Sequence, residues 1–183
     1  VMAGLVEAMD AVEDRDDVRV VVLSAAGRDF CRGLPRGCRW PARTWPDGVG
    51  AIGRVTRPVV AAVSGEARGW GLALALACDI RLLARRAALV VPSPDAELPG
   101  GGLGARLARI VGSARAAELL LLGGRVPARR AVEWGLAGAA VAETRLVRAA
   151  NKWHRTFKAW RAANPDKAAL LDSAANPPSA AHL

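Results

Sequence analysis

Several side chains have the types used in nucleophilic or metal chemistry, but their spacing supports neither. The three cysteines lack the spacing of a metal site, and their odd number favours reduced, buried thiols over a disulfide framework. Ser64 has no G-x-S-x-G frame, and both histidines, His154 and His182, lie far away in the C-terminal segment. No His, Cys and carboxylate cluster predicts a metal site. The groups left for chemistry are backbone amides and isolated carboxylates.

Glycines mark three short segments that can bring main-chain groups close to a ligand. They lie within residues 27–33, 65–71 and 100–104. Glycine has no Cβ, so its backbone can approach a bound molecule closely. The last segment, with Gly102-Leu-Gly104, lacks the third glycine and the long preceding strand of a dinucleotide-binding fingerprint. These glycines therefore do not predict a nucleotide-binding loop.

Three segments, in order along the chain, resemble the enoyl-CoA hydratase/isomerase (crotonase) family. Residues 18–33 end in G-R-D-F-C-R-G, similar to the family's strand and G-x-x-F-C-x-G loop. Residues 57–80 contain R-P-V-V-A-A-V-S-G-E-A-R-G-W-G, similar to K-P-V-I-A-A-V-x-G-x-A-x-G-G-G. Residues 98–116 and 131–136 resemble P-G-x-G-G…R-L-x-R-x-V-G and A-x-x-x-G-L. One glycine motif is a weak signal, but three in matching order, spanning residues 15–141, are specific.

The resemblance implies a site that binds an acyl-CoA thioester and stabilises its enolate. Charge on the thioester oxygen needs two fixed N–H donors, and losing one costs roughly 10²–10³ in rate. By the resemblance, the donors are the N–H groups of Leu34 and Trp70, the second at a helix start that favours an anion. It also implies no cofactor besides the coenzyme A of the substrate, and a homo-trimer. The predicted substrate-binding residues are Arg32, Gly33, Gly69, Gly71 and Pro92.

The sequence departs from the family where the family carries its proton chemistry. The middle glycine of G-G-G is Trp70, whose indole either enters the site and displaces the acyl group or points away from it. The two glutamates of the family's hydratases fall on Ala73 and on Pro92 or Ser93. None of these can act as a general acid or base, a role worth roughly 10²–10⁴ in rate. Standard hydration should therefore be crippled.

Other carboxylates are the candidates to replace those glutamates. Asp95 and Glu97 lie on the loop expected to line the pocket and are the predicted catalytic residues; Glu66 is a further candidate. The competing interpretation is that these are solvated loop carboxylates, because charges usually stay in water. Asp79 also matches a family position, where it is expected to anchor local structure.

Hydrophobic periodicity predicts an α/β fold that positions these segments. Residues 65–71 are predicted to be a turn, and Ser113 to be the N-cap of a helix. Predicted helices cover 2–13, 72–77, a segment ending at 110, 114–122 and a segment from 127 to before 135, and predicted strands cover 18–23, 59–63, 80–83 and 89–91. With the resemblance, this is a crotonase-like ββα spiral core whose N-terminal strand pair is missing, followed by a helical tail.

Composition divides the chain into a core, residues 1–141, and an atypical tail, residues 142–183. Residues 1–150 contain no Lys, Asn or Gln, whereas both histidines and several Lys and Asn lie beyond. In the tail, Leu146, Trp153, Phe157 and Trp160 form an apolar helical stripe expected to pack on the core or on another subunit. No apolar run reaches about 20 residues and no signal segment opens the chain, so a cytoplasmic protein without a membrane partner is expected.

Three functions remain open at this level. The first is an enzyme of enoyl-CoA hydration, isomerisation or a related enolate reaction in fatty acid metabolism. The second is an inactive acyl-CoA-binding or accessory subunit of the same fold. The third, a nucleic-acid-binding protein, has only the net charge of +9 behind it, because the arginines are scattered among acidic residues.

Overall fold

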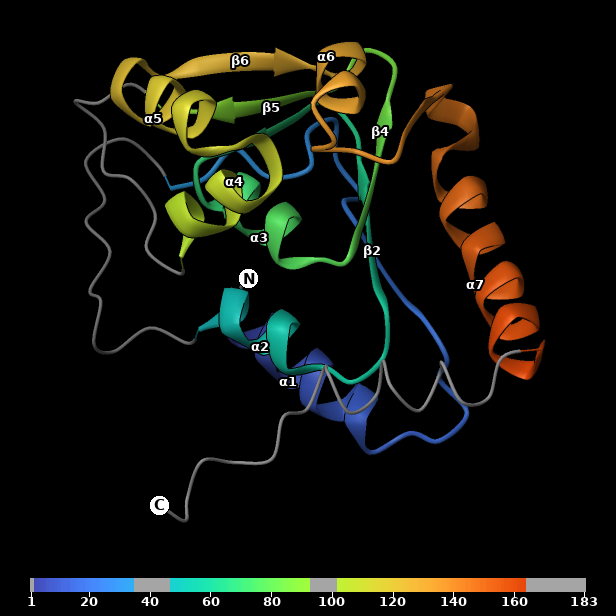
Figure 1. Cartoon of the computed structure of the whole chain (residues 1–183). Helices are drawn as coiled ribbons and strands as arrows, with labels where there is room; N and C mark the ends of the chain where they lie inside the picture. The colour runs from blue at the N-terminus through green and yellow to red at the C-terminus, as the bar shows by residue number, and fades with distance from the viewer. Residues whose placement is uncertain (1, 35–46, 93–101, 164–183) are drawn as a thin grey trace.

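The computed structural model describes residues 2–34, 47–92 and 102–163, which form a mixed α/β fold with two sheets (Figure 1). The first sheet is parallel and has the order β1-β2-β4-β7. The predicted α/β class is confirmed. The strands of this sheet are β1 Val21–Ser24, β2 Val59–Val63, β4 Ile80–Ala84 and β7 Ala139–Val141.

A second sheet has the order β3-β5-β6, with β3 parallel and β6 antiparallel to the central β5. Its strands are β3 Glu66–Arg68, β5 Ala88–Val91 and β6 Gly124–Pro127. The prediction of a turn over 65–71 is wrong in its middle, where β3 pairs with β5. A three-residue strand flanked by Gly65 and Gly69 has too few side chains to show the alternation by which strands are predicted.

Helices surround the two sheets. They are α1 Met2–Glu13, α2 Gly48–Arg54, α3 Trp70–Ala77, α4 Leu103–Val111, α5 Ser113–Leu122, α6 Ala128–Glu133 and α7 Leu146–Ala163, with the 3-10 turn η1 Glu143–Arg145 before the last. Ser113 is the first residue of α5, and Gly112 precedes it without a side-chain cap, so the predicted N-cap is wrong.

Helix α2 is absent from the sequence prediction because three of its seven residues are glycines, which disfavour helix. Its start is fixed by Asp47, whose carboxylate accepts a hydrogen bond from the Gly50 N–H at 2.8 Å. A Cβ at Gly48 would lie 2.7 Å from the Met2 sulfur. The glycine therefore allows α1 and α2 to pack closely.

Strand β1 is shorter and less buried than predicted. It begins at Val21 rather than Val18, and its three apolar residues are only half-buried. Within the described residues, β1 pairs with β2 alone, so it lies at an edge of the sheet. Strand β2, by contrast, is buried at every residue.

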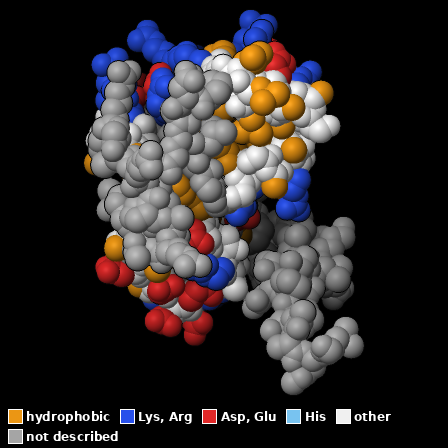
Figure 2. Space-filling view, turned by 90° about the vertical axis from the view of Figure 1, so that its left-hand side faces the viewer, with side chains coloured by type: hydrophobic (Ala, Val, Ile, Leu, Met, Phe, Trp, Pro, Cys, Tyr) orange, Lys and Arg blue, Asp and Glu red, His pale blue; other side chains and the backbone are white. Residues whose placement is uncertain are grey.

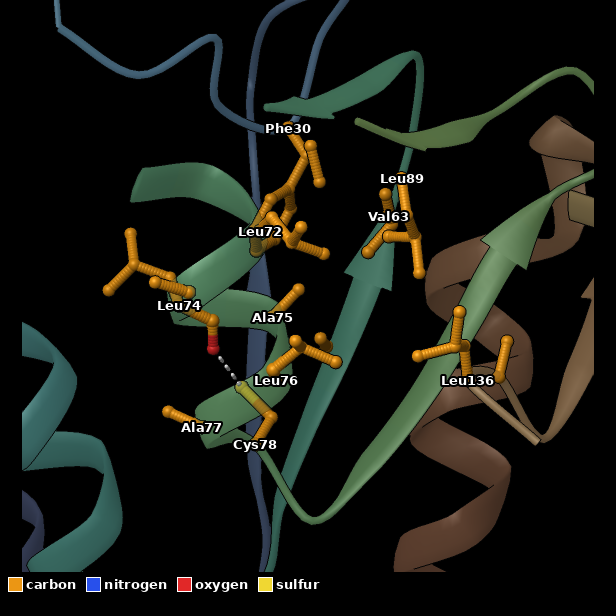
Figure 3. Packing of buried hydrophobic residues seen from close by; sticks show 14 of the residues in the cluster. Phe30, Val63, Leu72, Leu74, Ala75, Leu76, Ala77, Cys78, Leu89 and Leu136 are labelled. Atoms are coloured by element: carbon orange, nitrogen blue, oxygen red, sulfur yellow. Dashed lines mark hydrogen bonds between the residues drawn. The ribbon is translucent and has the colours of Figure 1, made fainter. Parts of the chain in front are cut away.

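The core centres on α3, all eight residues of which are buried. In Figure 3, Ala75 and Leu76 point from α3 toward β2, while Leu74 points away from the sheet. Helix α7 covers the opposite face of the same sheet (Figures 1 and 3). The sheet therefore separates two distinct regions of the molecule.

Charge is unevenly distributed over the surface. Acidic side chains gather at the end formed by α1 and the turn after it, whereas arginines gather at the other end (Figure 2). The exposed acidic residues of this end are Glu7, Asp10, Glu13, Asp14, Asp16 and Asp17.

Candidate functional site

The loop after β1 is held against β3 by main-chain hydrogen bonds. The Phe30 N–H donates to the Ser64 carbonyl at 2.8 Å, and the Cys31 N–H donates to the Glu66 carbonyl at 3.1 Å. The Arg68 N–H donates back to the Cys31 carbonyl at 2.9 Å. A loop that follows residue 24 is thereby fixed beside a segment that begins some 40 residues later.

This pairing brings Gly33 to the start of α3. Gly33 has a φ of +83°, a left-handed conformation that favours glycine. A Cβ built on it would lie 3.1 Å from the Arg68 carbonyl oxygen and 3.7 Å from the Trp70 nitrogen. The two segments that the resemblance assigns to the oxyanion site therefore lie side by side, with Leu34 half-buried directly after Gly33. That the N–H groups of Leu34 and Trp70 meet at one oxygen stays a prediction.

Gly69 orients the first turn of α3. Its φ is +55°, and its N–H donates to the Val90 carbonyl at 3.1 Å. Its carbonyl accepts from the Ala73 N–H at 3.0 Å, which begins the helical hydrogen-bond ladder. A Cβ at Gly69 would lie 3.3 Å from Cγ of Pro92, which is itself buried. Four of the five predicted substrate-binding residues, Gly33, Gly69, Gly71 and Pro92, therefore lie around one helix N-terminus.

The sequence motif does not reveal how closely Gly71 packs. A Cβ there would collide with the Cys31 carbonyl oxygen and lie 2.8 Å from the Cys31 Cβ. Cys31 thus positions the loop through both its main chain and its side chain. Only the glycine at 71 signals this contact, because a single parallel bridge such as Cys31 to Ala67 leaves no periodicity.

The Trp70 indole is almost buried. The residue is 8% exposed and belongs to the hydrophobic cluster that contains Leu72 and Phe30. As the first residue of α3, Trp70 presents its N–H at the positive end of the helix dipole. A bulky side chain at this position is therefore compatible with the fold.

The remaining predicted residues differ in setting. Arg32 is exposed, with its Nε 3.9 Å from an Asp29 carboxylate oxygen. Asp95, Glu97 and Ser93 lie outside the described residues. Ala73, where the family's hydratases have a glutamate, is completely buried in the first turn of α3.

Two other carboxylates have structural partners. Glu66 lies between Arg68, at 3.3 Å, and Arg125, at 3.5 Å. Asp79 accepts a hydrogen bond from the Val59 N–H at 2.8 Å, and its own N–H donates to the Val59 carbonyl at 2.9 Å. Asp79 therefore anchors the start of β2 to β4, as predicted.

The groups at the C-terminal end of α3, opposite the proposed site, are largely buried. Burial raises the pKa of the Cys78 thiol, at the end of α3, to about 12. The thiol donates to the Leu74 carbonyl at 3.3 Å (Figure 3). Burial also lowers the pKa of Arg81, whose guanidinium donates to the Leu136 and Cys78 carbonyls at 2.7 and 2.5 Å. Cys78 behaves as the buried thiol predicted, while Cys31 is half-buried.

No group of three His, Cys, Asp or Glu side chains within residues 2–34, 47–92 and 102–163 could hold a metal ion. None of the helices described is both long and apolar enough to cross a membrane. What the site offers is a set of backbone groups at the start of a buried helix.

Comparison with known proteins finds sequence relatives over most of the chain. A family model described as enoyl-CoA hydratase/isomerase matches residues 1–181. The 1,2-epoxyphenylacetyl-CoA isomerase of Escherichia coli is 36% identical over 148 residues, 73% of this chain and 56% of that protein. The chain spans 52% to 56% of the length of the first curated relatives it matches.

Solved structures show the same fold. The enoyl-CoA hydratase of Bacillus anthracis superimposes with a TM-score of 0.75 and 31% identity, covering 85% of this chain and 64% of that one. A monofunctional enoyl-CoA isomerase of Mycobacterium smegmatis gives a TM-score of 0.78 and 30% identity, covering 98% and 82%. The predicted crotonase-like core with a helical C-terminal region is confirmed.

Proposed function

Because the chain belongs to the enoyl-CoA hydratase/isomerase family, we propose that it binds an acyl-CoA thioester and stabilises the enolate of that thioester. The two donors to the thioester oxygen are the N–H groups of Leu34 and Trp70. Gly33, Gly69, Gly71 and Pro92 shape the main chain around that oxygen. The exposed Arg32 is available to a CoA phosphate.

One observation carries the proposal: the Gly33 loop lies against the amide nitrogen that starts α3. A Cβ at Gly33 would lie 3.7 Å from the Trp70 nitrogen, although the two residues are 37 positions apart. The helix dipole adds favourable potential for an oxyanion at this end. Gly69, Gly71 and Pro92 are buried, and a low dielectric strengthens hydrogen bonds to a developing charge.

We assign any proton transfer to Asp95 or Glu97, because the buried Ala73 and Pro92 have no acidic group. The reaction would then be double-bond isomerisation, hydration or a related enolate reaction. The lack of an acid or base at Ala73 and Pro92 is also what a second candidate function would require, that of an acyl-CoA binder without turnover. In both cases the proposed assembly is a homo-trimer, which analytical ultracentrifugation would test.

The binding proposal is tested by calorimetric titration with butyryl-CoA, a saturated and unreactive thioester. Trp70→Pro removes the N–H donor at a first-turn position where proline is tolerated. Trp70→Ala is the matched control, since it removes the same indole and keeps the N–H. We expect Trp70→Pro to weaken binding at least 10-fold relative to Trp70→Ala. Equal binding by two folded variants would refute the oxyanion role of residue 70.

Turnover of crotonyl-CoA and of a 3-enoyl-CoA separates the two candidates. Loss of turnover in Asp95→Asn or Glu97→Gln, with butyryl-CoA binding retained, would support the enzyme. Binding without any turnover of either thioester would support the binder. DNA binding that is stronger than CoA binding and falls steeply with salt would overturn both.

A further inference from the structure

Helix α7 carries a second candidate site on the face of the sheet opposite to α3 (Figure 1). The helix is anchored by Leu146 and Ala150, which are 3% and 0% exposed. Trp153, one turn further along the same stripe, is 40% exposed. The apolar stripe thus extends beyond the part of the helix that packs on the sheet.

Trp153 lines a cavity of about 310 Å³. Its walls are mainly apolar and come from two elements of the sheet and from α7 itself. The residues that line it are Leu82, Ala139, Val141, Ala149, Lys152, Trp153 and Thr156. The volume is at the lower end of the range found for small-molecule sites. An apolar chain of modest length would fit such a space.

A neighbouring hollow of about 490 Å³ supplies positive charge. It is lined by Arg145, Arg148, Lys152 and Ala149, and it shares the last two with the apolar cavity. Arg148 and Lys152 are one turn apart on α7, and Arg145 lies in the 3-10 turn directly before the helix, so all three cations line the same hollow. All three are exposed, and none forms an ion pair with another described residue. Their charge is therefore available to a ligand.

We propose that this α7 site, defined by Arg145, Arg148, Lys152 and Trp153, binds an amphipathic carboxylate. The apolar chain lies between Trp153 and the sheet, and the carboxylate lies among the three cations, nearest Lys152. Charge complementarity selects an anion, and the joined apolar cavity selects one with a hydrocarbon chain. The site is separate from the start of α3, because the parallel sheet lies between them. The proposal is thus independent of thioester binding.

Calorimetric titration with decanoate tests the proposal, with decanol as the uncharged probe of equal chain length. We expect decanoate to bind at least 10-fold more tightly than decanol. Lys152→Gln and Trp153→Ala should each weaken decanoate binding at least 5-fold. The matched controls are Arg86→Gln, which removes an exposed charge elsewhere, and Leu122→Ala, which removes an exposed apolar side chain. Both should bind within 2-fold of the unaltered chain.

Three outcomes would overturn the proposal. The first is the absence of decanoate binding below its micelle concentration. The second is equal weakening by the site variants and the control variants, which would indicate non-specific adsorption. The third is concentration-dependent dimerisation that Trp153→Ala abolishes, without decanoate binding, which would make this face an interface between two copies. Circular dichroism of each variant verifies that α7 is retained.

Discussion

The two faces of the parallel sheet differ in how they can recognise a ligand. On the α3 face, every residue of the helix is buried, and the groups that we propose for ligand binding are main-chain amides beside glycine turns. On the α7 face, the groups that we propose for ligand binding are exposed side chains, Lys152 and Trp153 among them. Ligand recognition on the α3 face would thus depend on main-chain groups, and recognition on the α7 face on side chains.

This difference explains which features of a family can survive substitution. Every residue except proline carries a backbone N–H, so Trp70 can replace a glycine without removing the donor. A general acid depends on its side chain, and alanine at position 73 abolishes it. Binding of the thioester oxygen by main-chain N–H groups should therefore tolerate more substitutions than proton transfer by side chains does.

The largest expected effect comes from disrupting the α3 face at Gly71. Gly71→Ala would force a Cβ into the Cys31 carbonyl, and both contacting groups are main chain or close to it. We expect the free energy of unfolding to fall by about 3 kcal/mol or more, and butyryl-CoA binding to be lost. Urea denaturation and calorimetry would measure these changes.

The control for this substitution is Gly4→Ala in α1, where a Cβ meets no atom within 4 Å. There the same change should raise the free energy of unfolding by about 0.5–1 kcal/mol, because alanine favours helix. Similar destabilisation at both positions would show that the contact between Gly71 and Cys31 does not constrain the site.

A second, somewhat smaller effect is expected at the attachment of α7. Leu146→Ala removes a buried side chain that fixes the helix to the sheet, and should cost about 2–3 kcal/mol. Val147, 50% exposed, is the matched position, where the change to alanine should cost under about 0.5 kcal/mol. Denaturant melts would measure both.

Leu146→Ala should also weaken decanoate binding while leaving butyryl-CoA binding intact, as calorimetry would show. Loss of both ligands at a temperature where the variant is folded would mean that the two faces are coupled, contrary to their separation by the sheet.

The sequence predicts most of the elements on the α3 face of the parallel sheet and fewer of the other elements. Strand β2, which follows Pro58, and helix α3, which ends shortly before Asp79, are each a continuous apolar run. Their burial therefore follows from composition. Helix α2 could not be predicted, because its glycines serve close packing against α1 rather than local helix preference. Strands β6 and β7 have four and three residues and depend on partners far along the chain.

The site shows the same division. The convergence of the Leu34 and Trp70 N–H groups is predicted through a family resemblance rather than through periodicity, and the position of Gly33 beside the Trp70 nitrogen supports it. The role of Cys31 is not predicted, because a main-chain carbonyl that accepts a bond from Arg68 leaves no trace in residue type. The cavity lined by Trp153 lies between α7 and residues of β4 and β7, an arrangement that no local sequence pattern encodes.

The smallest expected effect comes from the titration of Cys78, which tests how strongly solvent is excluded from the C-terminal end of α3. Its pKa is about 12 in the folded chain against 9.0 for a free thiol, so folding favours the protonated form. This contribution to stability is fully present below about pH 9 and is lost progressively between pH 9 and 12, as the unfolded chain gives up its proton first.

From pH 7.5 to 9.5, the free energy of unfolding should therefore fall by about 0.8 kcal/mol more in the unaltered chain than in Cys78→Ala, which cannot titrate there. Guanidinium melts at the two pH values give this difference. At pH 8, Cys78 should also be alkylated far more slowly than the half-buried Cys31, as peptide mapping by mass spectrometry would show. Equal alkylation rates of Cys78 and Cys31 would mean that solvent reaches the end of α3. The α3 face would then not differ from the α7 face in its burial.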